Sequence, residues 1–193
     1  MCSSILSKMV FTRFGTGGGT LGETLGKILS ESEKVLAEER PDAVLILGDT
    51  NSAISAIMAR RMKIPVYHME AGNRSFDRNV PEETNRKLVD HISDFNLVYT
   101  EHARSHLLSE GVQHRRIYLT GSPMREVLEH YRERIRASDI LARLGLAKRN
   151  YFIVSLHREE NVDSVVRLKA LVDALNRIAA QYKMPIIVST HPR

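Results

Sequence analysis

Two patterns of apolar residues alternate along the chain, one with helical spacing and one made of short, unbroken runs. Leu21, Leu25 and Ile28 recur on one helix face, whereas residues 43–47 (AVLIL) are apolar without interruption. Helical spacing predicts helices within residues 21–36, 52–62, 81–92, 102–110 and 162–182. The apolar runs predict strands at residues 43–47, 65–69, 95–99, 116–120, 151–156 and 185–189. Because strands that are apolar on both faces and alternate with helices form covered parallel sheets, the sequence predicts an α/β, Rossmann-like, doubly wound fold.

The charged segment between Gly121 and Asn150 interrupts this alternation. It contains two helix-like pieces and no apolar run. We therefore predict an N-terminal Rossmann-like domain over residues 1–122, a helical connection over 123–149, and the start of a second domain over 150–193. This last region has one helix and two strands, which is too little for a closed core of its own.

Composition places the chain among ordinary globular proteins. Of its 193 residues, 42% are hydrophobic and 26% are charged. No apolar run approaches the roughly 20 residues that cross a bilayer, and the first ten residues do not resemble a secretory signal. Cys2 is the only cysteine, which excludes an intrachain disulfide and fits a reducing compartment. We expect a cytoplasmic protein with no membrane partner.

The formal net charge of +5 fits either nucleic acid or a small molecule that carries a diphosphate. The basic residues are not gathered in one patch, and the densest stretch, residues 131–144, interleaves arginine with acidic and apolar residues. Aromatic residues make up 6% of the chain, and tryptophan is absent. These features argue against a nucleic-acid-binding module.

A glycine-rich segment formally matches the dinucleotide fingerprint G-x-G-x-x-G. Gly17, Gly19 and Gly22 supply the three glycines. The preceding segment is a weak strand interrupted by Arg13, so we interpret the glycines as a flexible approach to the first helix. No nicotinamide cofactor is expected.

Carboxylates follow two neighbouring strands of the predicted sheet. Asp49 comes directly after the run at 43–47, and Glu70 ends the run at 65–69, within His68-Met69-Glu70-Ala71-Gly72. Ligands of parallel α/β sheets bind where the carboxyl ends of the strands meet the following loops. Asp49 could instead cap the next helix, and His68 is expected to be a hydrogen-bonded core residue rather than a ligand.

Further charged groups cluster after other strands. Residues 81–86 (PEETNR) open a helix, where acidic residues also suit the helix dipole, and residues 157–161 (HREEN) follow the strand at 151–156. His102 and His106 have the spacing of two metal ligands on a helix, but no third ligand completes the set, so we predict no metal site.

These motifs together resemble the non-hydrolysing UDP-N-acetylglucosamine 2-epimerase family. The resemblance rests on GDTNS, on HMEAGNRSFDRNVPEETNRK, and on TGSP, HREEN and STHPR, and it covers about Leu21 to Arg193. The joint occurrence of HxEAGxR and PEExNR is its most specific part. The segment HMEAGNRSFDR resembles the corresponding segment in one branch of the family. That branch acts on UDP-2,3-diacetamido-glucuronate or on precursors of N-acetyl-L-fucosamine.

The resemblance implies a glycosyltransferase-B-like architecture of two domains, a homodimer, and a role in surface-polysaccharide synthesis without a cofactor. It assigns the catalytic groups and substrate contacts by motif. The implied catalytic residues are Asp49, Glu70, Glu82 and His157. The implied substrate-binding residues lie in these motifs or directly beside a catalytic residue. They are Arg74, Arg86, Arg158 and His191. The implied substrate is a UDP-sugar.

The chemistry that the resemblance implies is elimination of UDP across C1–C2, followed by re-addition after protonation on the other face. It needs a base on one side of C2 and an acid on the other, and carboxylates in suitable surroundings can serve both roles. Alternatives are a UDP-dependent glycosyltransferase of the same fold, a hydrolysing epimerase, and a noncatalytic nucleotide-binding fragment.

The sequence also departs from the family. Met1–Gly17 does not resemble the family's first strand and arginine-bearing loop, and the chain stops at Arg193, before a glycine- and serine-rich segment that grips UDP. We therefore expect both domains to be truncated, and the chain alone to bind UDP-sugars weakly with little turnover.

Overall fold

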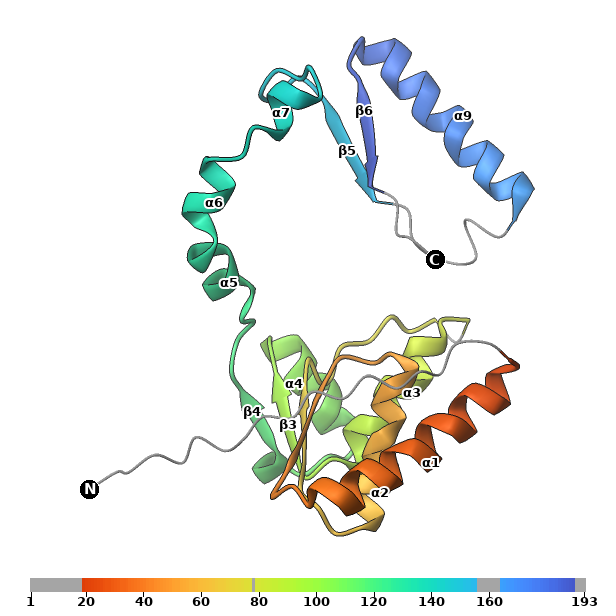
Figure 1. Ribbon diagram of the computed structural model, residues 1–193, viewed down its shortest axis with the longest axis vertical. Helices are drawn as coiled ribbons and strands as arrows, with labels where there is room; N and C mark the ends of the chain where they lie inside the picture. Colours follow the sequence, from red (N-terminus) through yellow and green to blue (C-terminus); the bar gives the residue numbers. More distant parts are fainter. Residues whose placement is uncertain (1–18, 78, 156–163, 190–193) are drawn as a thin grey trace. The chain divides into compact units, whose positions relative to one another are not determined.

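The computed structural model describes residues 19–77, 79–155 and 164–189 (Figure 1). Its strands are β1 (Val44–Leu47), β2 (Val66–Met69), β3 (Phe95–Val98), β4 (Ile117–Leu119), β5 (Phe152–Ser155) and β6 (Ile186–Ser189). Its α-helices are α1 (Leu21–Glu39), α2 (Ala56–Arg61), α3 (Pro81–Ile92), α4 (Glu101–Ser109), α5 (Met124–His130), α6 (Arg132–Arg136), α7 (Ile140–Arg143) and α9 (Val165–Tyr182). Short 3-10 turns are η1 (Asn51–Ser55) and η2 (His114–Arg116). The six strands lie within the six predicted runs.

The chain divides into two compact units, Met1–Arg125 and Glu126–Arg193. All strands pair in parallel, in the order β1-β2-β3-β4 in the first unit and β5-β6 in the second. The prediction of an α/β fold built on Rossmann-like parallel sheets is confirmed. The domain limits at residues 122 and 149 stay a prediction.

The register of the first sheet gives its two faces different surroundings. Ile46, His68, Asn96 and Ile117 are aligned across the four strands and are all buried. Their immediate neighbours in each strand point to the opposite face, where Leu45, for example, is exposed. The crossover helices of the first unit therefore cover one face of the sheet, as a sequential order of right-handed crossovers requires.

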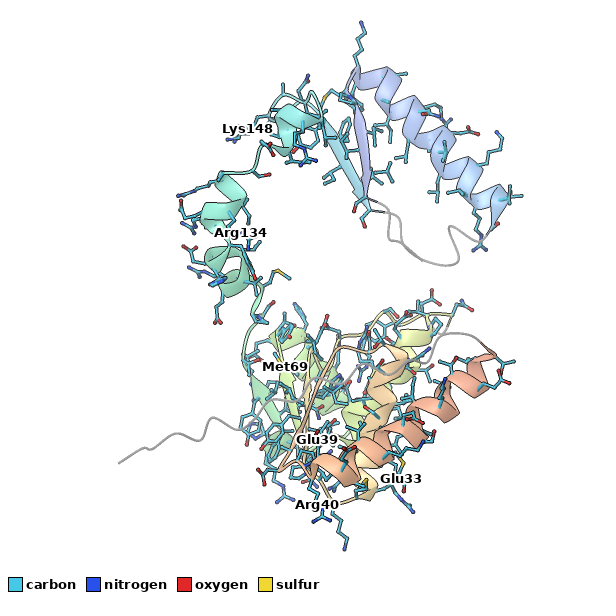
Figure 2. All side chains as sticks on the ribbon, in the orientation of Figure 1. Glu33, Glu39, Arg40, Met69, Arg134 and Lys148 are labelled. Carbon is cyan, nitrogen blue, oxygen red and sulfur yellow. The ribbon has the colours of Figure 1, made fainter. Side chains whose placement is uncertain are left out.

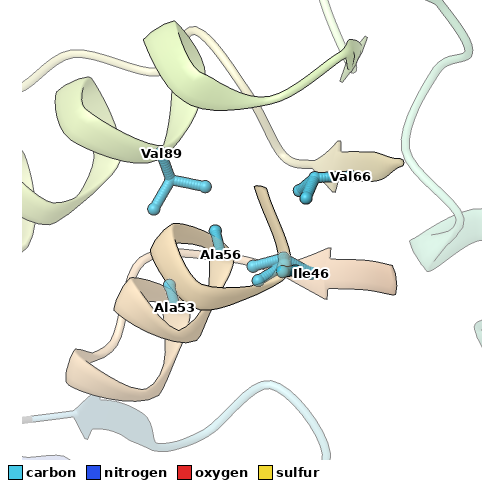
Figure 3. Close-up of a cluster of buried hydrophobic side chains, with 6 residues drawn as sticks. Ile46, Ala53, Ala56, Val66 and Val89 are labelled. Atoms are coloured by element: carbon cyan, nitrogen blue, oxygen red, sulfur yellow. The ribbon is translucent and has the colours of Figure 1, made fainter. Parts of the chain in front are cut away.

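The main core of the first unit lies under α2 and α3 (Figure 3). It consists of Ile46, Ala53, Ala56, Ala59, Val66 and Val89, with Leu36 of α1 packed against it. Alanine on the sheet-facing side of α2 lets the helix backbone approach the strands closely. A second cluster of Ala71, Val98, Ala103, Leu107, Val112 and Ile117 seats α4 against β3 and β4.

Local sequence signals set the limits of the helices. The Thr20 side chain accepts a bond from Glu23 N, while the Glu23 carboxylate accepts one from Thr20 N, which forms a capping box at the start of α1. Pro81 occupies the first turn of α3, as predicted. Gly111 follows α4 with φ 86°, a left-handed conformation that favours glycine.

The connecting segment differs from its prediction. It contains three short helices, α5, α6 and α7, where two helix-like pieces were expected. Helical geometry is lost at Tyr131 and again near Asp139, whose backbone dihedrals fall outside the helical region. Arg134 and Lys148 are exposed along this segment (Figure 2), in agreement with its interpretation as a solvated charged face.

The second unit contains β5, α9 and β6. Phe152 and Tyr182 make an edge-to-face aromatic contact that packs the end of α9 against β5. Its described helix α9 has no buried residue, which agrees with the expectation that this region lacks a closed core. Within the described ranges, no helix combines the length and apolar character that membrane crossing requires.

Replacing Leu107 with Ala should destabilise the first unit by about 2–5 kcal/mol, because its fully buried side chain would leave a cavity between α4 and the sheet. Replacing the neighbouring Leu108, which is 41% exposed, should cost less than about 1 kcal/mol. Urea unfolding followed by circular dichroism measures both. An equal loss of unfolding free energy in both variants would contradict the packing of α4 against the sheet through Leu107.

Candidate active site at the carboxyl edge of the first sheet

The carboxyl ends of β1 and β2 bring Asp49 and Glu70 to the same edge of the sheet. Leu47 pairs with Met69, and Gly48 N donates to Met69 O at 3.2 Å. The Glu70 Oε2 atom lies 3.6 Å from the position that a Cβ on Gly48 would occupy. The predicted juxtaposition of these two strand ends is therefore present in the structure.

Glu70 adopts a backbone conformation that is unfavourable for its residue type. Its φ is 67°, in the left-handed region, where a non-glycine residue costs of order 1–3 kcal/mol. Its Oε1 atom accepts one long hydrogen bond from Asn73 Nδ2 at 3.4 Å. Strained non-glycine residues of this kind cluster at functional sites, so the conformation of Glu70 favours a function for its side chain.

The first turns of α3 are joined to the turn after β1. Arg86 forms an ion pair with Asp49, and Asn85 Nδ2 donates to Asp49 O at 3.0 Å and to Asn51 Oδ1 at 3.1 Å. Glu82 is exposed and lies four residues before Arg86, so both side chains lie on the same side of α3. The structure thus associates the PEETNR helix with the edge that carries Asp49.

The second glutamate of this motif has a structural role. Glu83 is buried, and its Oε2 accepts bonds from Ser75 N at 2.9 Å and from Arg86 at 3.3 Å. Burial opposes its charge, but the bonds from Ser75 and the nearby Lys87 outweigh burial and lower the pKa of Glu83. Glu83 therefore holds the loop after Glu70 onto α3, while Glu82 stays accessible.

Arg74, predicted to bind substrate, has a buried side chain that is engaged within the protein. It donates from Nη1 to Asp90 at 2.7 Å, and from Nε and Nη2 to Glu110 at 2.7 and 2.5 Å. Burial opposes its charge, but the bonds and charges of Glu110 and Asp90 raise the pKa of the guanidinium above its ordinary value. A substrate contact by Arg74 stays a prediction; its observed contacts are internal.

Gly72 of the HMEAG motif lies where any side chain would clash with α4. Its φ is 77°, and a Cβ at this position would lie 2.4 Å from the carbonyl oxygen of Ala103. Gly72 N donates to Asp90, and Gly72 O lies 3.0 Å from His106 Nδ1. The glycine thus permits close packing of the Glu70 loop on α4, and His106 has a structural contact.

Tyr99 is a site residue that the sequence analysis missed. It follows β3 at the same sheet edge, and its hydroxyl is buried without a hydrogen-bond partner among the described residues. Burial, and then the negative charge of Glu70, raise the pKa of the phenol. Its position at the end of a predicted strand, one strand beyond Glu70, was the available signal.

Three predicted site residues, His157, Arg158 and His191, lie outside the described residues. Among the residues that are described, no group of three or more His, Cys, Asp or Glu side chains could hold a metal ion.

A cavity of about 620 Å³ lies elsewhere, at the amino-terminal edge of the first sheet. Its lining includes Pro65 and Asp94, which precede β2 and β3, together with Arg60, Arg115 and Arg116. Asp49, Glu70 and Glu82 are not among its lining residues. We therefore place the candidate site at the carboxyl edge, where the strained Glu70 and the Asp49 turn meet.

A parallel α/β unit with polar residues at its strand carboxyl ends is the arrangement of Rossmann-like enzymes that bind nucleotides. Comparison with known proteins makes this more specific. Residues 6–193 match the UDP-N-acetylglucosamine 2-epimerase family, and the chain belongs to that family. The match begins at residue 6, so the prediction that Met1–Gly17 has no counterpart in the family is wrong for residues 6–17.

Relatives include two kinds of named epimerase. The chain is 43% identical over 181 residues to a UDP-N-acetylglucosamine 2-epimerase of Methanocaldococcus jannaschii, covering 92% of this chain and 50% of the relative. It is 38% identical over 180 residues to a UDP-2,3-diacetamido-2,3-dideoxy-D-glucuronate 2-epimerase of Pseudomonas aeruginosa, covering 91% and 49%. The chain spans about half the length of these relatives.

Solved structures agree with this membership. The UDP-N-acetylglucosamine 2-epimerase of Rickettsia bellii matches with a TM-score of 0.84 at 48% identity, over 92% of this chain and 46% of that one. The M. jannaschii enzyme in complex with UDP-GlcNAc and UDP matches with a TM-score of 0.85 at 42% identity, over 93% and 50%. The fold is therefore that of these glycosyltransferase-B-like epimerases.

Replacing Glu110 with Gln should lower the stability of the first unit at pH 7 by about 1–3 kcal/mol, because Arg74 loses a charged partner. The hydrogen bond from Arg74 lowers the pKa of Glu110 below its ordinary value of 4.5. The contribution of the charged carboxylate to stability is therefore fully present above pH 4.5 and is lost as the pH falls through the lowered pKa. The difference between variant and wild type should shrink in acid.

Urea unfolding at pH 7 and below pH 4.5 measures this difference. Glu101→Gln is the matched control. Glu101 is 64% exposed and its carboxylate pairs with Arg104 at 3.4 Å, so this replacement should change stability by less than about 0.5 kcal/mol. A Glu110→Gln difference that is equally large in acid would show that the stabilisation does not come from the carboxylate charge.

Proposed function

We propose that the protein containing this chain inverts C2 of a UDP-linked N-acetylhexosamine. The observation that supports this most directly is the meeting of Asp49, Glu70 and the start of α3 at one carboxyl edge of a parallel sheet. Membership of the epimerase family, and the relative solved with UDP-GlcNAc and UDP, give the chemical class of the substrate.

The proposed reaction has two half-steps. A carboxylate removes the proton from C2, the C–H electron pair forms a C1=C2 double bond, and the C1–O bond breaks to release UDP. UDP then adds back to C1 as a proton is delivered to the opposite face of C2. No redox change occurs, so the chemistry requires only positioned acids, bases and groups that stabilise the diphosphate.

Asp49, Glu70 and Glu82 form the proposed proton-transfer set. The Arg86 guanidinium pairs directly with the Asp49 carboxylate, and this contact suits a base or an electrostatic role for Asp49. The negative charge of Glu70 acts on the buried hydroxyl of Tyr99, whose pKa is raised by burial and by that charge. His157, Arg158 and His191 are proposed to contact the substrate and its diphosphate by motif alone.

The biological setting is proposed by the same reasoning. A cytoplasmic homodimer that supplies a precursor for surface polysaccharides fits the lone cysteine and the named relatives. The Pseudomonas relative makes a diacetamido-glucuronate derivative the second substrate to test after UDP-N-acetylglucosamine.

A chimaera provides the test, because the chain spans half of its relatives. The matching half of the M. jannaschii enzyme is replaced by this chain, and the product is incubated with UDP-N-acetylglucosamine in D₂O. We expect deuterium at C2 and appearance of the C2 epimer by NMR. A folded chimaera that binds UDP but neither exchanges nor inverts C2 would favour the noncatalytic alternative, and release of free sugar would favour a hydrolysing enzyme.

Glu70→Gln in this chimaera should reduce C2 exchange by about 10²-fold or more, because the side chain keeps its size but can no longer transfer a proton. Glu101→Gln, at the first residue of α4 near the same edge, is the matched control and should retain exchange. Exchange that persists at the wild-type rate in Glu70→Gln removes Glu70 from the proton-transfer set.

A further inference from the structure

His68 is a fully buried side chain in the middle of the first sheet, and both of its ring nitrogens have partners. Its Nε2 lies 2.9 Å from Gly48 O, and its Nδ1 lies 2.8 Å from Asp90 Oδ1. These contacts agree with the prediction from the sequence that His68 is a hydrogen-bonded core residue.

The chemistry of the two partners defines the proton count on this ring. A backbone carbonyl oxygen can only accept a hydrogen bond. Asp90 also accepts bonds from Gly72 N at 3.2 Å and from the Arg74 guanidinium at 2.7 Å, which is the behaviour of an ionised carboxylate. A neutral imidazole has one N–H, so it would leave one nitrogen lone pair facing an oxygen lone pair in a dry interior.

The surrounding charges can accommodate a second proton. A doubly protonated His68 and Arg74 would be balanced by Asp90 and Glu110, which leaves this buried cluster close to neutral. On its outer side, His91 Nε2 lies 4.0 Å from Glu110, and Lys87 of α3 also acts on Glu110.

The same bonds join the two turns of the candidate site. Gly48 directly precedes Asp49, and Gly72 follows Glu70 by two residues. His68 contacts the first turn through Gly48 O, and its partner Asp90 contacts the second through Gly72 N. The hydrogen-bonded side chains of His68 and Asp90 therefore link the backbone just before Asp49 to the backbone just after Glu70.

We propose that His68 is a buried imidazolium with protons on both ring nitrogens, and that it acts with Asp90 as a positioning pair for the Asp49 and Glu70 turns. Its charge state is independent of the proposed function. Its importance for catalysis rests on that function.

Nitrogen-15 NMR of the histidine rings tests the charge state in the chain itself. At neutral pH, both His68 nitrogens should resonate at the protonated position and show coupled hydrogens. The His68 signals are assigned by their loss in His68→Gln. One unprotonated His68 nitrogen, as in a neutral tautomer, overturns the imidazolium.

Amide hydrogen exchange tests positioning without any substrate. In His68→Gln, one amide can donate to only one of the two acceptors, so exchange at Asp49, Glu70 and Gly72 should accelerate by about tenfold more than exchange at Leu97 in β3. Asp90→Asn should produce the same local pattern if the glutamine variant folds poorly. A uniform acceleration over the whole unit would reduce His68 to a general stabilising role.

Discussion

The candidate site depends on one constraint, which is that the turn after β1 is held against the start of α3. The Arg86–Asp49 ion pair and the Asn85 bond to Asp49 O connect segments that lie 36 and 37 residues apart. Parallel pairing of β1 with β2 then brings Glu70 to the same edge. Without the α3 contacts, a parallel sheet would still align two strand ends, but Glu82 would have no fixed relation to them.

The loop between β2 and α3 is held by charged side chains that are buried or partly buried. Asp90 and Glu110 bind Arg74, and Glu83 binds Ser75, so the chain after Glu70 is anchored on α3 and α4. Buried ion pairs contribute little net stability compared with apolar packing, but they specify one geometry because a misplaced charge is costly. Apolar packing thus supplies stability and the ion pairs fix the geometry of the loop, as a site with an unfavourable Glu70 backbone conformation requires.

Much of this arrangement could be predicted from the sequence, because its signals are local. Apolar runs located the strands, Pro81 located the start of α3, and the strand-end rule located Asp49 and Glu70. Asp90 and Glu110 could not be found, because they lie 16 and 36 residues from Arg74, one in α3 and one capping the end of α4, and no local pattern marks their pairing. For the same reason Arg74 looked free to meet a ligand, and Tyr99 looked like another apolar residue of a strand.

A crystal structure of the epimerase chimaera with UDP-N-acetylglucosamine tests the central claim most directly. The account predicts that C2 of the sugar lies about 3–4 Å from carboxylate oxygens at the carboxyl edge of the first sheet, with Glu70 on one side of the ring and Asp49 or Glu82 on the other. A sugar bound at the opposite edge, beside Arg115 and Arg116, or one whose C2 faces none of these carboxylates, would contradict it.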